Sequence, residues 1–170
     1  MKLTSTLTIK LVRLITFIEA QKHQFRLHKS HFTPQKVTVW AALSGNKIIG
    51  PFSFENENGI TVMVNSERYI GILERFWEEL DATCGPRRTR QYLQQDGATP
   101  HTSNITIKWL RDHFKSLIIS KICTIEWSPL SPDLSALDCF LWGFLKDRAY
   151  ASKPRNIFQL KEKIIEEIGP

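Results

Sequence analysis

The sequence has few cysteines and no long apolar run, and each absence excludes a class of protein. Its three cysteines, Cys84, Cys123 and Cys139, form no Cys-x-x-Cys pair and are odd in number. We therefore expect a reduced, intracellular protein without a disulfide framework or a zinc site. No apolar run reaches the roughly 20 residues of a membrane span, and the first residues lack the compact apolar core of a secretory signal.

The composition is that of one globular domain with an excess of positive charge. A chain of 170 residues can bury a substantial core, and five Trp and ten Phe supply large side chains for it. Lys and Arg outnumber Asp and Glu by 23 to 17, which gives a formal net charge of +6. A basic chain favours an acidic partner, of which nucleic acid is the usual example.

The pattern of apolar residues predicts antiparallel strands followed by alternating helices and strands. Runs rich in β-branched and aromatic residues predict strands at 11–17, 36–43, 47–54 and 60–64, in the run 91–93 that leads to Asp96, and in 116–119 or 123–127. Pro51 indicates an edge or a bulge in its strand. Helical spacing predicts helices at 65–84, 103–114, 134–145 and 156–168, with inward residues that include Ile105, Trp109, Leu110, Phe114, Leu141, Phe144 and Leu145.

This order of elements implies an α/β fold with one mixed sheet and helices on its faces. We expect residues 1–10 to form a tail and residues 11–168 to form a single domain. In such a sheet, the end of a central parallel strand is a natural cleft.

The stretch from Gln94 to His101 carries a carboxylate at the end of one predicted strand. Asp-Gly is turn chemistry, and Pro100 predicts no immediate return to regular structure. Asp96 would then lie at the end of a buried strand, beside a cleft. Taken alone, this stretch favours a turn aspartate that bonds its own backbone; the alternative is a metal ligand.

A second carboxylate, Asp138, lies near the apolar face of the helix predicted to start at about residue 134. Such a carboxylate costs free energy unless something pairs with it. Asp96 and Asp138 could meet at one edge of the sheet. Paired carboxylates suit two hard cations, which can activate a water and stabilise a leaving oxygen in phosphodiester cleavage.

The residues around both aspartates resemble the transposases of the Tc/mariner superfamily. Residues 94–102, Gln94-Gln95-Asp96-Gly97-Ala98-Thr99-Pro100-His101-Thr102, look like the second catalytic block of that family. Residues 128–138, Ser128-Pro129-Leu130-Ser131-Pro132-Asp133-Leu134-Ser135-Ala136-Leu137-Asp138, look like the third block. Shorter segments at 36–40, 48–52, 64–69 and 140–147 are also similar, so the resemblance covers roughly residues 11 to 168.

The resemblance implies a ribonuclease H-like core in which three acidic residues hold two Mg²⁺ or Mn²⁺ ions and act on DNA. By position, Asp96 matches the second acidic ligand and Asp138 the third, so both would be catalytic metal ligands. The resemblance also implies a nuclear protein, with a homodimer as the candidate assembly, and the lack of a long apolar run predicts no membrane partner. The candidate nucleic-acid contacts are Lys36, Arg87, Arg88, Arg90 and His101.

Two departures from the family pattern bear on activity. The first acidic ligand of the family is an Asp at the end of the first strand, but this chain reads Thr16-Phe17-Ile18-Glu19-Ala20-Gln21, and the segment that follows is shortened. Glu19 either matches the glutamate beside that Asp or substitutes for it as a catalytic carboxylate. We also expect no helix-turn-helix region of the kind that precedes the core in full-length members, and therefore no specific recognition of element ends.

Three functional hypotheses follow from these observations. The first is a truncated transposase core whose catalysis is severely reduced or absent, because metal-site geometry is strict. The second is a non-enzymatic remnant that binds nucleic acid through the arginines at 87–90 and the basic stretch 22–36, which is otherwise a solvated loop. The third is a product without function.

Overall fold

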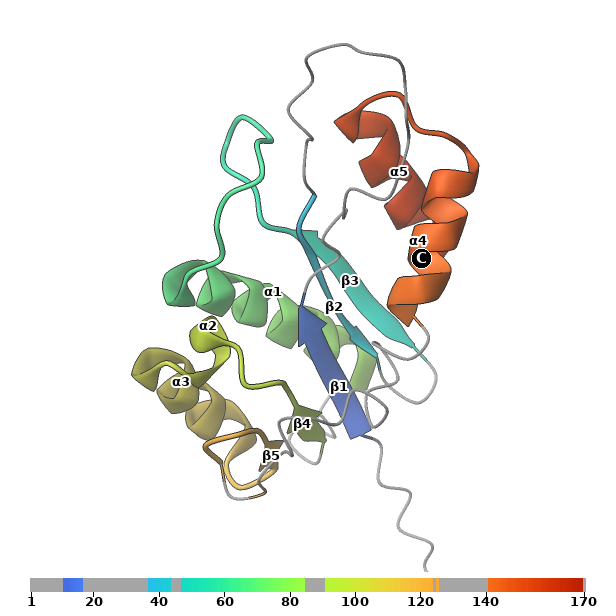
Figure 1. Cartoon of the computed structure of the whole chain (residues 1–170). Coiled ribbons are helices and arrows are strands. Elements are labelled where there is room, and N and C mark those ends of the chain that lie inside the picture. The colour runs from blue at the N-terminus through green and yellow to red at the C-terminus, as the bar shows by residue number, and fades with distance from the viewer. Residues whose placement is uncertain are drawn as a thin grey trace, which may run out of the picture.

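The computed structural model in Figure 1 describes residues 11–16, 37–43, 47–84, 91–123, 125 and 141–169. These residues form a mixed α/β structure, and no helix among them has the length and apolar character of a bilayer span. The elements are β1 (Leu11–Thr16), β2 (Val39–Leu43), β3 (Ile48–Ser53), α1 (Ser66–Cys84), β4 (Tyr92–Gln94), α2 (Thr99–Thr102), α3 (Asn104–Phe114), β5 (Ile118–Ile119), α4 (Trp142–Ala151) and α5 (Ile157–Ile168).

The strands form one mixed sheet, as the order of elements predicts, and their order in it is β3-β2-β1-β4-β5. Strand β2 is antiparallel to both of its neighbours. Strands β1, β4 and β5 run parallel to one another, so their carboxyl ends lie at the same edge. That edge is where an open α/β sheet places ligands.

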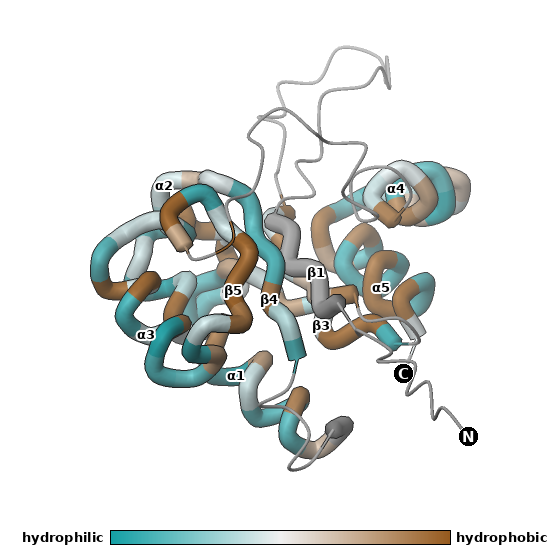
Figure 2. The backbone as a smooth tube through the Cα atoms, turned by 90° about the horizontal axis from the view of Figure 1, so that it is seen from below, coloured by the Kyte–Doolittle hydropathy of each residue, from teal (hydrophilic) through white to brown (hydrophobic). Residues whose placement is uncertain are grey.

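The side chains of β2 alternate between two separate apolar cores. Trp40 and Ala42 join the core that α1 and α3 complete, whereas Val39 and Ala41 join the core that α4 and α5 complete. Figure 2 shows α1, α2 and α3 on one side of the strands and α4 and α5 on the other. The prediction of helices on both faces is therefore confirmed.

Helix α1 begins where the sequence predicts, because Asn65 caps it. The Asn65 Oδ1 accepts a hydrogen bond of 2.9 Å from the backbone N–H of Arg68, and its carbonyl accepts one of 2.9 Å from that of Tyr69. The cap supplies hydrogen-bond acceptors for N–H groups that the start of a helix otherwise leaves without partners. It also fixes the first buried residue of the helix, Tyr69, which reaches the candidate site.

Strand β3 carries the irregularity that Pro51 predicts. Its pairing with β2 shifts register between Trp40 and Ala42, opposite Gly50 and Pro51, and β3 is also an edge strand. The peptide bond between Gly50 and Pro51 is cis. Gly50 has a φ of +102°, and a Cβ there would lie 3.0 Å from the carbonyl oxygen of Trp40. The bulge therefore requires glycine at this position.

The predicted strand at 60–64 is wrong, since this segment forms only an isolated bridge between Glu55 and Thr61. The reason lies in the preceding turn. The Asn56 Oδ1 accepts hydrogen bonds of 3.0 Å from the N–H groups of both Asn58 and Ile60. An Asn side chain that binds the backbone in this way competes with strand pairing.

The prediction that Pro100 prevents regular structure is also wrong, because α2 starts at Thr99 and contains Pro100 in its first turn. Proline is well accommodated there, since its φ is preset and a first-turn residue needs no backbone donor. The short helix matters for the site, because it carries His101.

Two residues predicted to point inward are exposed instead. The core face of α3 follows Ile107, Leu110 and Phe114, and Ile105 lies off this row with 46% of its surface exposed. On α4 the buried row repeats every four residues through Leu145, which leaves Phe144 exposed. Both errors come from the choice of helical row rather than from the existence of the helix.

Candidate functional site

Asp96 lies two residues beyond β4, at the edge where the parallel strands end. Gln94, the last residue of β4, pairs with Arg13 of β1 and with Ile119 of β5. The backbone N–H of Gln95 donates to the carbonyl of Ile119 at 3.0 Å, so the chain stays attached to β5 up to the residue before Asp96. Asp96 therefore leaves the sheet at the position predicted from the sequence.

The Asp96 carboxylate is held by its own loop and by a buried histidine. Its Oδ1 accepts a hydrogen bond of 3.0 Å from the backbone N–H of Ala98 and lies 2.5 Å from the Nδ1 atom of His101. The Asp96 side chain is 42% exposed, whereas that of His101 is fully buried. The bond to Ala98 is ordinary turn chemistry. The buried imidazole is an additional support that a simple turn does not require.

The ring of Tyr69 in turn supports His101 from α1. The two rings stack with their centroids 4.2 Å apart, and the Tyr69 hydroxyl donates a hydrogen bond of 2.9 Å to the Oε1 atom of Gln95. Burial, together with the negative charge of Asp96, raises the pKa of Tyr69. The phenol therefore keeps its proton and remains a hydrogen-bond donor at neutral pH.

Gln95 connects the elements around this loop. Its Nε2 donates to the backbone carbonyl of His101 at 2.9 Å and to the Oγ of Ser120 at 3.3 Å. Its Oε1 accepts from Tyr69, so both ends of the buried amide are used. One side chain thus connects α1, α2 and the residue after β5. These three parts of the structure together fix the position of Asp96.

Hydroxyl groups fix α2 against α3. The Thr106 Oγ1 donates a hydrogen bond of 2.7 Å to the carbonyl of Pro100, and the Ser103 Oγ accepts one of 3.3 Å from the backbone N–H of Thr106. Ser103 is the N-cap of α3. These bonds determine where α2 lies and therefore where His101 meets Asp96.

The sequence did not predict the roles of Tyr69, Gln95 and Ser120 at this site. Helical spacing alone places Tyr69 on the apolar face of α1 and does not indicate a role for its hydroxyl. The signal that could have revealed Gln95 is its spacing, since it lies two positions after the buried Leu93 and so faces the same side. A buried amide needs partners, so an inward Gln beside Asp96 predicts a polar network.

The other predicted site residues lie outside the part of the chain that the structure describes. This holds for the carboxylates of Glu19 and Asp138 and for the basic residues Lys36, Arg87, Arg88 and Arg90. The structure therefore brings together Asp96 and His101, and the meeting of Asp96 with Asp138 stays a prediction.

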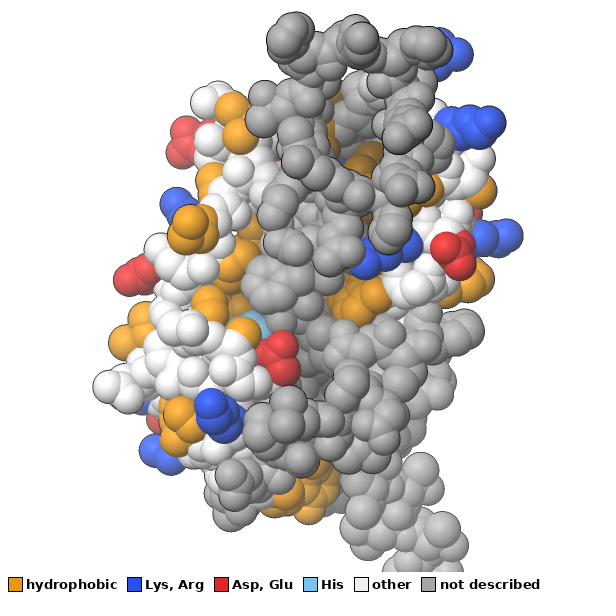
Figure 3. Space-filling model, viewed as in Figure 1, with side chains coloured by type: hydrophobic (Ala, Val, Ile, Leu, Met, Phe, Trp, Pro, Cys, Tyr) orange, Lys and Arg blue, Asp and Glu red, His pale blue; other side chains and the backbone are white. Residues whose placement is uncertain are grey.

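Among the described residues, no group of three His, Cys, Asp or Glu side chains has the arrangement of a metal site. On the face seen in Figure 3, the acidic side chains are separated from one another. Asp96 supplies one hard oxygen ligand of the kind that Mg²⁺ and Mn²⁺ prefer. Its bonds to Ala98 and His101 are the outer support that metal-binding carboxylates usually have, so its chemistry fits one ligand of such a site.

His101 lies in a different position from that expected of a nucleic-acid contact. Its side chain has no exposed surface, because it is enclosed between Tyr69 and the Asp96 loop. A buried imidazole cannot touch DNA in this conformation. Its observed contact is with Asp96, which it orients.

Lys121 adds positive charge beside the same loop. A Cβ placed on Gly97 would lie 2.9 Å from the Cδ of Lys121, so this side chain lies across the residue that follows Asp96. Gly97 therefore permits the close approach of a cationic side chain to the loop.

Comparison with known proteins does not identify a family. No protein-family model matches the chain, and no curated protein matches it. The likeness of residues 94–102 and 128–138 to transposase sequences therefore rests on those segments themselves.

Proposed function

We propose that this chain is a transposase-derived catalytic core of the Tc/mariner type with a ribonuclease H-like fold. Its ancestral activity is metal-dependent cleavage and strand transfer of DNA at transposon ends. The observation that carries the proposal is Asp96, a partly exposed carboxylate at the carboxyl edge of parallel strands, which His101 holds in position. In this proposal the partner is DNA, the compartment is the nucleus and the assembly is a homodimer.

The sheet supports the proposal at the level of architecture. Three antiparallel strands continue into parallel strands, and helices cover both faces. This is the mixed arrangement that the resemblance implies. The carboxyl ends of its parallel strands lie at one edge, and the residues most similar to the family's second catalytic block follow β4 there. The architecture alone does not select a reaction, so the function rests on the carboxylate and its surroundings.

The described residues would contribute position and charge to the reaction. Asp96 would hold Mg²⁺ or Mn²⁺ together with Asp138, and the bound ions would supply a Lewis acid for phosphodiester cleavage. His101 fixes the direction of the Asp96 carboxylate, while Tyr69 and Gln95 prevent its loop from shifting. Such support matters, because small displacements of a catalytic group reduce rates strongly.

Catalysis is impaired in this proposal, since no Asp follows the first strand. Strand β1 runs parallel to β4, so the chain leaves β1 at the same edge as Asp96. The first carboxylate beyond that point in the sequence is Glu19. A longer side chain at a shifted position would place its oxygens differently from those of an Asp. The two metal ions would then lack a correctly placed ligand.

The proposal is tested by a DNA nicking assay with Mn²⁺ on supercoiled plasmid. Nicking by the wild-type chain that Asp96→Ala abolishes would support a surviving enzyme. Nicking that persists in Asp96→Ala would refute the assigned site. Asp147→Ala, which removes an exposed carboxylate from α4, is the matched control and should nick as the wild-type chain does.

The second candidate function is nucleic-acid binding without catalysis. Two observations favour it, namely the formal net charge of +6 and the lack of an Asp in the segment Thr16-Phe17-Ile18-Glu19, where the family has its first acidic ligand. Salt-sensitive DNA binding by a chain that shows no nicking would support this candidate. Nicking that depends on Asp96 would exclude it.

A further inference from the structure

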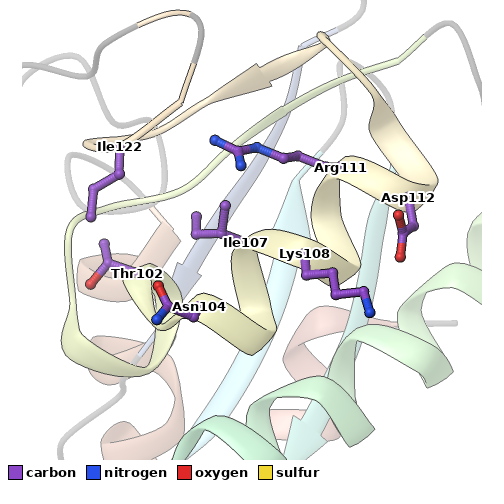
Figure 4. A pocket seen from close by; sticks show the side chains of 7 residues that line it. All are labelled: Thr102, Asn104, Ile107, Lys108, Arg111, Asp112 and Ile122. Atoms are coloured by element: carbon purple, nitrogen blue, oxygen red, sulfur yellow. The ribbon is translucent and has the colours of Figure 1, made fainter.

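A hollow of about 410 Å³ lies between α3 and the turn that follows β5 (Figure 4). One wall is formed by α3 residues that recur at three- and four-residue spacing and so share one side of the helix. The other wall is formed by the turn that carries Ile122. The lining residues are Thr102, Asn104, Ile107, Lys108, Arg111, Asp112 and Ile122.

The lining combines positive charge with an apolar floor. Lys108 and Arg111 are exposed cations, and Asp112 is the one carboxylate among the lining residues. In Figure 4, Arg111 extends toward the turn that carries Ile122, while Asp112 lies at the far end of the hollow. Ile107 supplies apolar surface on the α3 wall, and Ile122 supplies it on the opposite wall. Lys and Arg neutralise phosphates, and the carbon atoms of a deoxyribose can pack against an apolar side chain, so this lining suits a nucleic-acid backbone.

The hollow adjoins the Asp96 loop through both of its walls. Thr102 follows His101 directly in α2, and its Oγ1 donates to the carbonyl of Ala98 at 3.2 Å. Ile122 follows Lys121, whose side chain lies across Gly97. Lys121 therefore extends the positive charge of the hollow to the residue beside Asp96.

We propose that this hollow seats the sugar–phosphate backbone of a DNA strand and directs it toward Asp96. Lys108, Arg111 and Lys121 contact successive phosphates, and Ile122 packs against a deoxyribose between them. The inference rests on the proposed function, because it names a surface by which the DNA substrate of that site is held. It assigns DNA contacts to described residues, in addition to the predicted contacts at Lys36 and at residues 87–90.

The test measures DNA binding by fluorescence anisotropy over a range of salt concentrations, with EDTA present so that no metal contributes. The triple variant Lys108→Gln, Arg111→Gln, Lys121→Gln should bind at least about tenfold more weakly at low salt. A plot of the logarithm of its binding constant against the logarithm of salt concentration should be less steep, by about one unit of slope for each phosphate contact removed. The control triple Lys146→Gln, Lys153→Gln, Arg155→Gln removes the same charge from the α4–α5 side and should bind as the wild-type chain does.

A second pair of variants tests the hollow without removing cations. Ile122 and Ile165 have similar exposed fractions, 54% and 58%, but only Ile122 lines the hollow. Ile122→Glu should weaken DNA binding at least about tenfold, since it places a negative charge where phosphates would lie, by the same electrostatic reasoning. Ile165→Glu should have little effect. Circular dichroism checks that every variant keeps the fold.

Three outcomes would overturn the inference: no DNA binding by the wild-type chain, equal losses in the two triple variants, or equal losses in the two glutamate variants. Because binding is measured without metal, these outcomes are independent of the nicking assay. DNA binding through the hollow without Asp96-dependent nicking would support the second candidate function, binding without catalysis, and leave the hollow supported.

Discussion

Buried polar side chains decide the geometry of the candidate site at the scale of single residues. Tyr69, Gln95 and His101 are each at most 1% exposed, and each uses a polar atom to fix a neighbour. A buried polar group left without its partner costs about 1–3 kcal/mol. The network therefore makes one arrangement of the Asp96 loop more stable than others.

Tyr69→Phe should lower the free energy of unfolding by about 1–3 kcal/mol, because it leaves the Gln95 Oε1 buried without its donor. The ring that stacks on His101 stays in place. Urea denaturation measures the change. Tyr92→Phe is the control, since Tyr92 is only half-buried and water can replace its hydroxyl, so we expect a change within about 0.5 kcal/mol. Equal losses in both variants would contradict the role of the Tyr69 hydroxyl.

Tyr69 also predicts a loss of stability at alkaline pH. Burial raises its pKa above the ordinary value of 10.0, so above about pH 10 the unfolded chain loses a proton that the folded chain keeps. The contribution of Tyr69 to stability is fully present below this pH. Above it, the free energy of unfolding falls by up to about 1.4 kcal/mol per pH unit. Urea denaturation from about pH 8 to about pH 11 should show a shallower decline in Tyr69→Phe than in the wild-type chain.

Tyr150 and Cys123, whose pKa values burial also raises, contribute to both proteins and cancel in this comparison. Parallel declines of the wild-type chain and Tyr69→Phe would show that Tyr69 is not the buried titrating group.

At the scale of elements, local chemistry was sufficient to predict most helices and strands. Asn65 at the start of α1, Ser103 at the start of α3 and the bulge at Pro51 each act within a few residues of their own position. The errors arose where two local signals compete. Pro100 can end a helix or begin one, and the Asn56 side chain accepts from the backbone N–H of Ile60, a donor that the predicted strand at 60–64 would have used.

Two glycines should respond in opposite ways to alanine substitution. Gly50→Ala should destabilise the protein by more than about 1 kcal/mol, because φ is +102° and the new Cβ would press on the Trp40 carbonyl. Gly71→Ala, within α1, should stabilise it by about 0.5–1 kcal/mol, since beyond its chain neighbours and the backbone of its own helix nothing lies within 4 Å of the added Cβ. Thermal or urea unfolding measures both. Changes of the same sign would be inconsistent with the bulge and helix geometry described above.

At the scale of the whole molecule, the sheet brings distant segments to one edge. Gln95 binds Tyr69, 26 positions earlier, and Ser120, 25 positions later. The sequence predicted that Asp96 lies at a strand end, because that depends on a local turn. It did not predict which side chains surround Asp96, because such contacts depend on how helices pack across the sheet. The pairing of Asp96 with Asp138 is a prediction of this second kind.

The measurement that tests the central claim most directly is Mn²⁺ binding, followed by electron paramagnetic resonance of the free ion. Asp96→Asn keeps the size of the side chain and removes its charge, and Asp112→Asn does the same at an exposed position on α3. We predict that Asp96→Asn weakens Mn²⁺ binding at least about tenfold, the scale of a disrupted ligand environment, while Asp112→Asn binds as the wild-type chain does. Equal Mn²⁺ affinities in the wild-type chain and Asp96→Asn would contradict the assignment of Asp96 as a metal ligand.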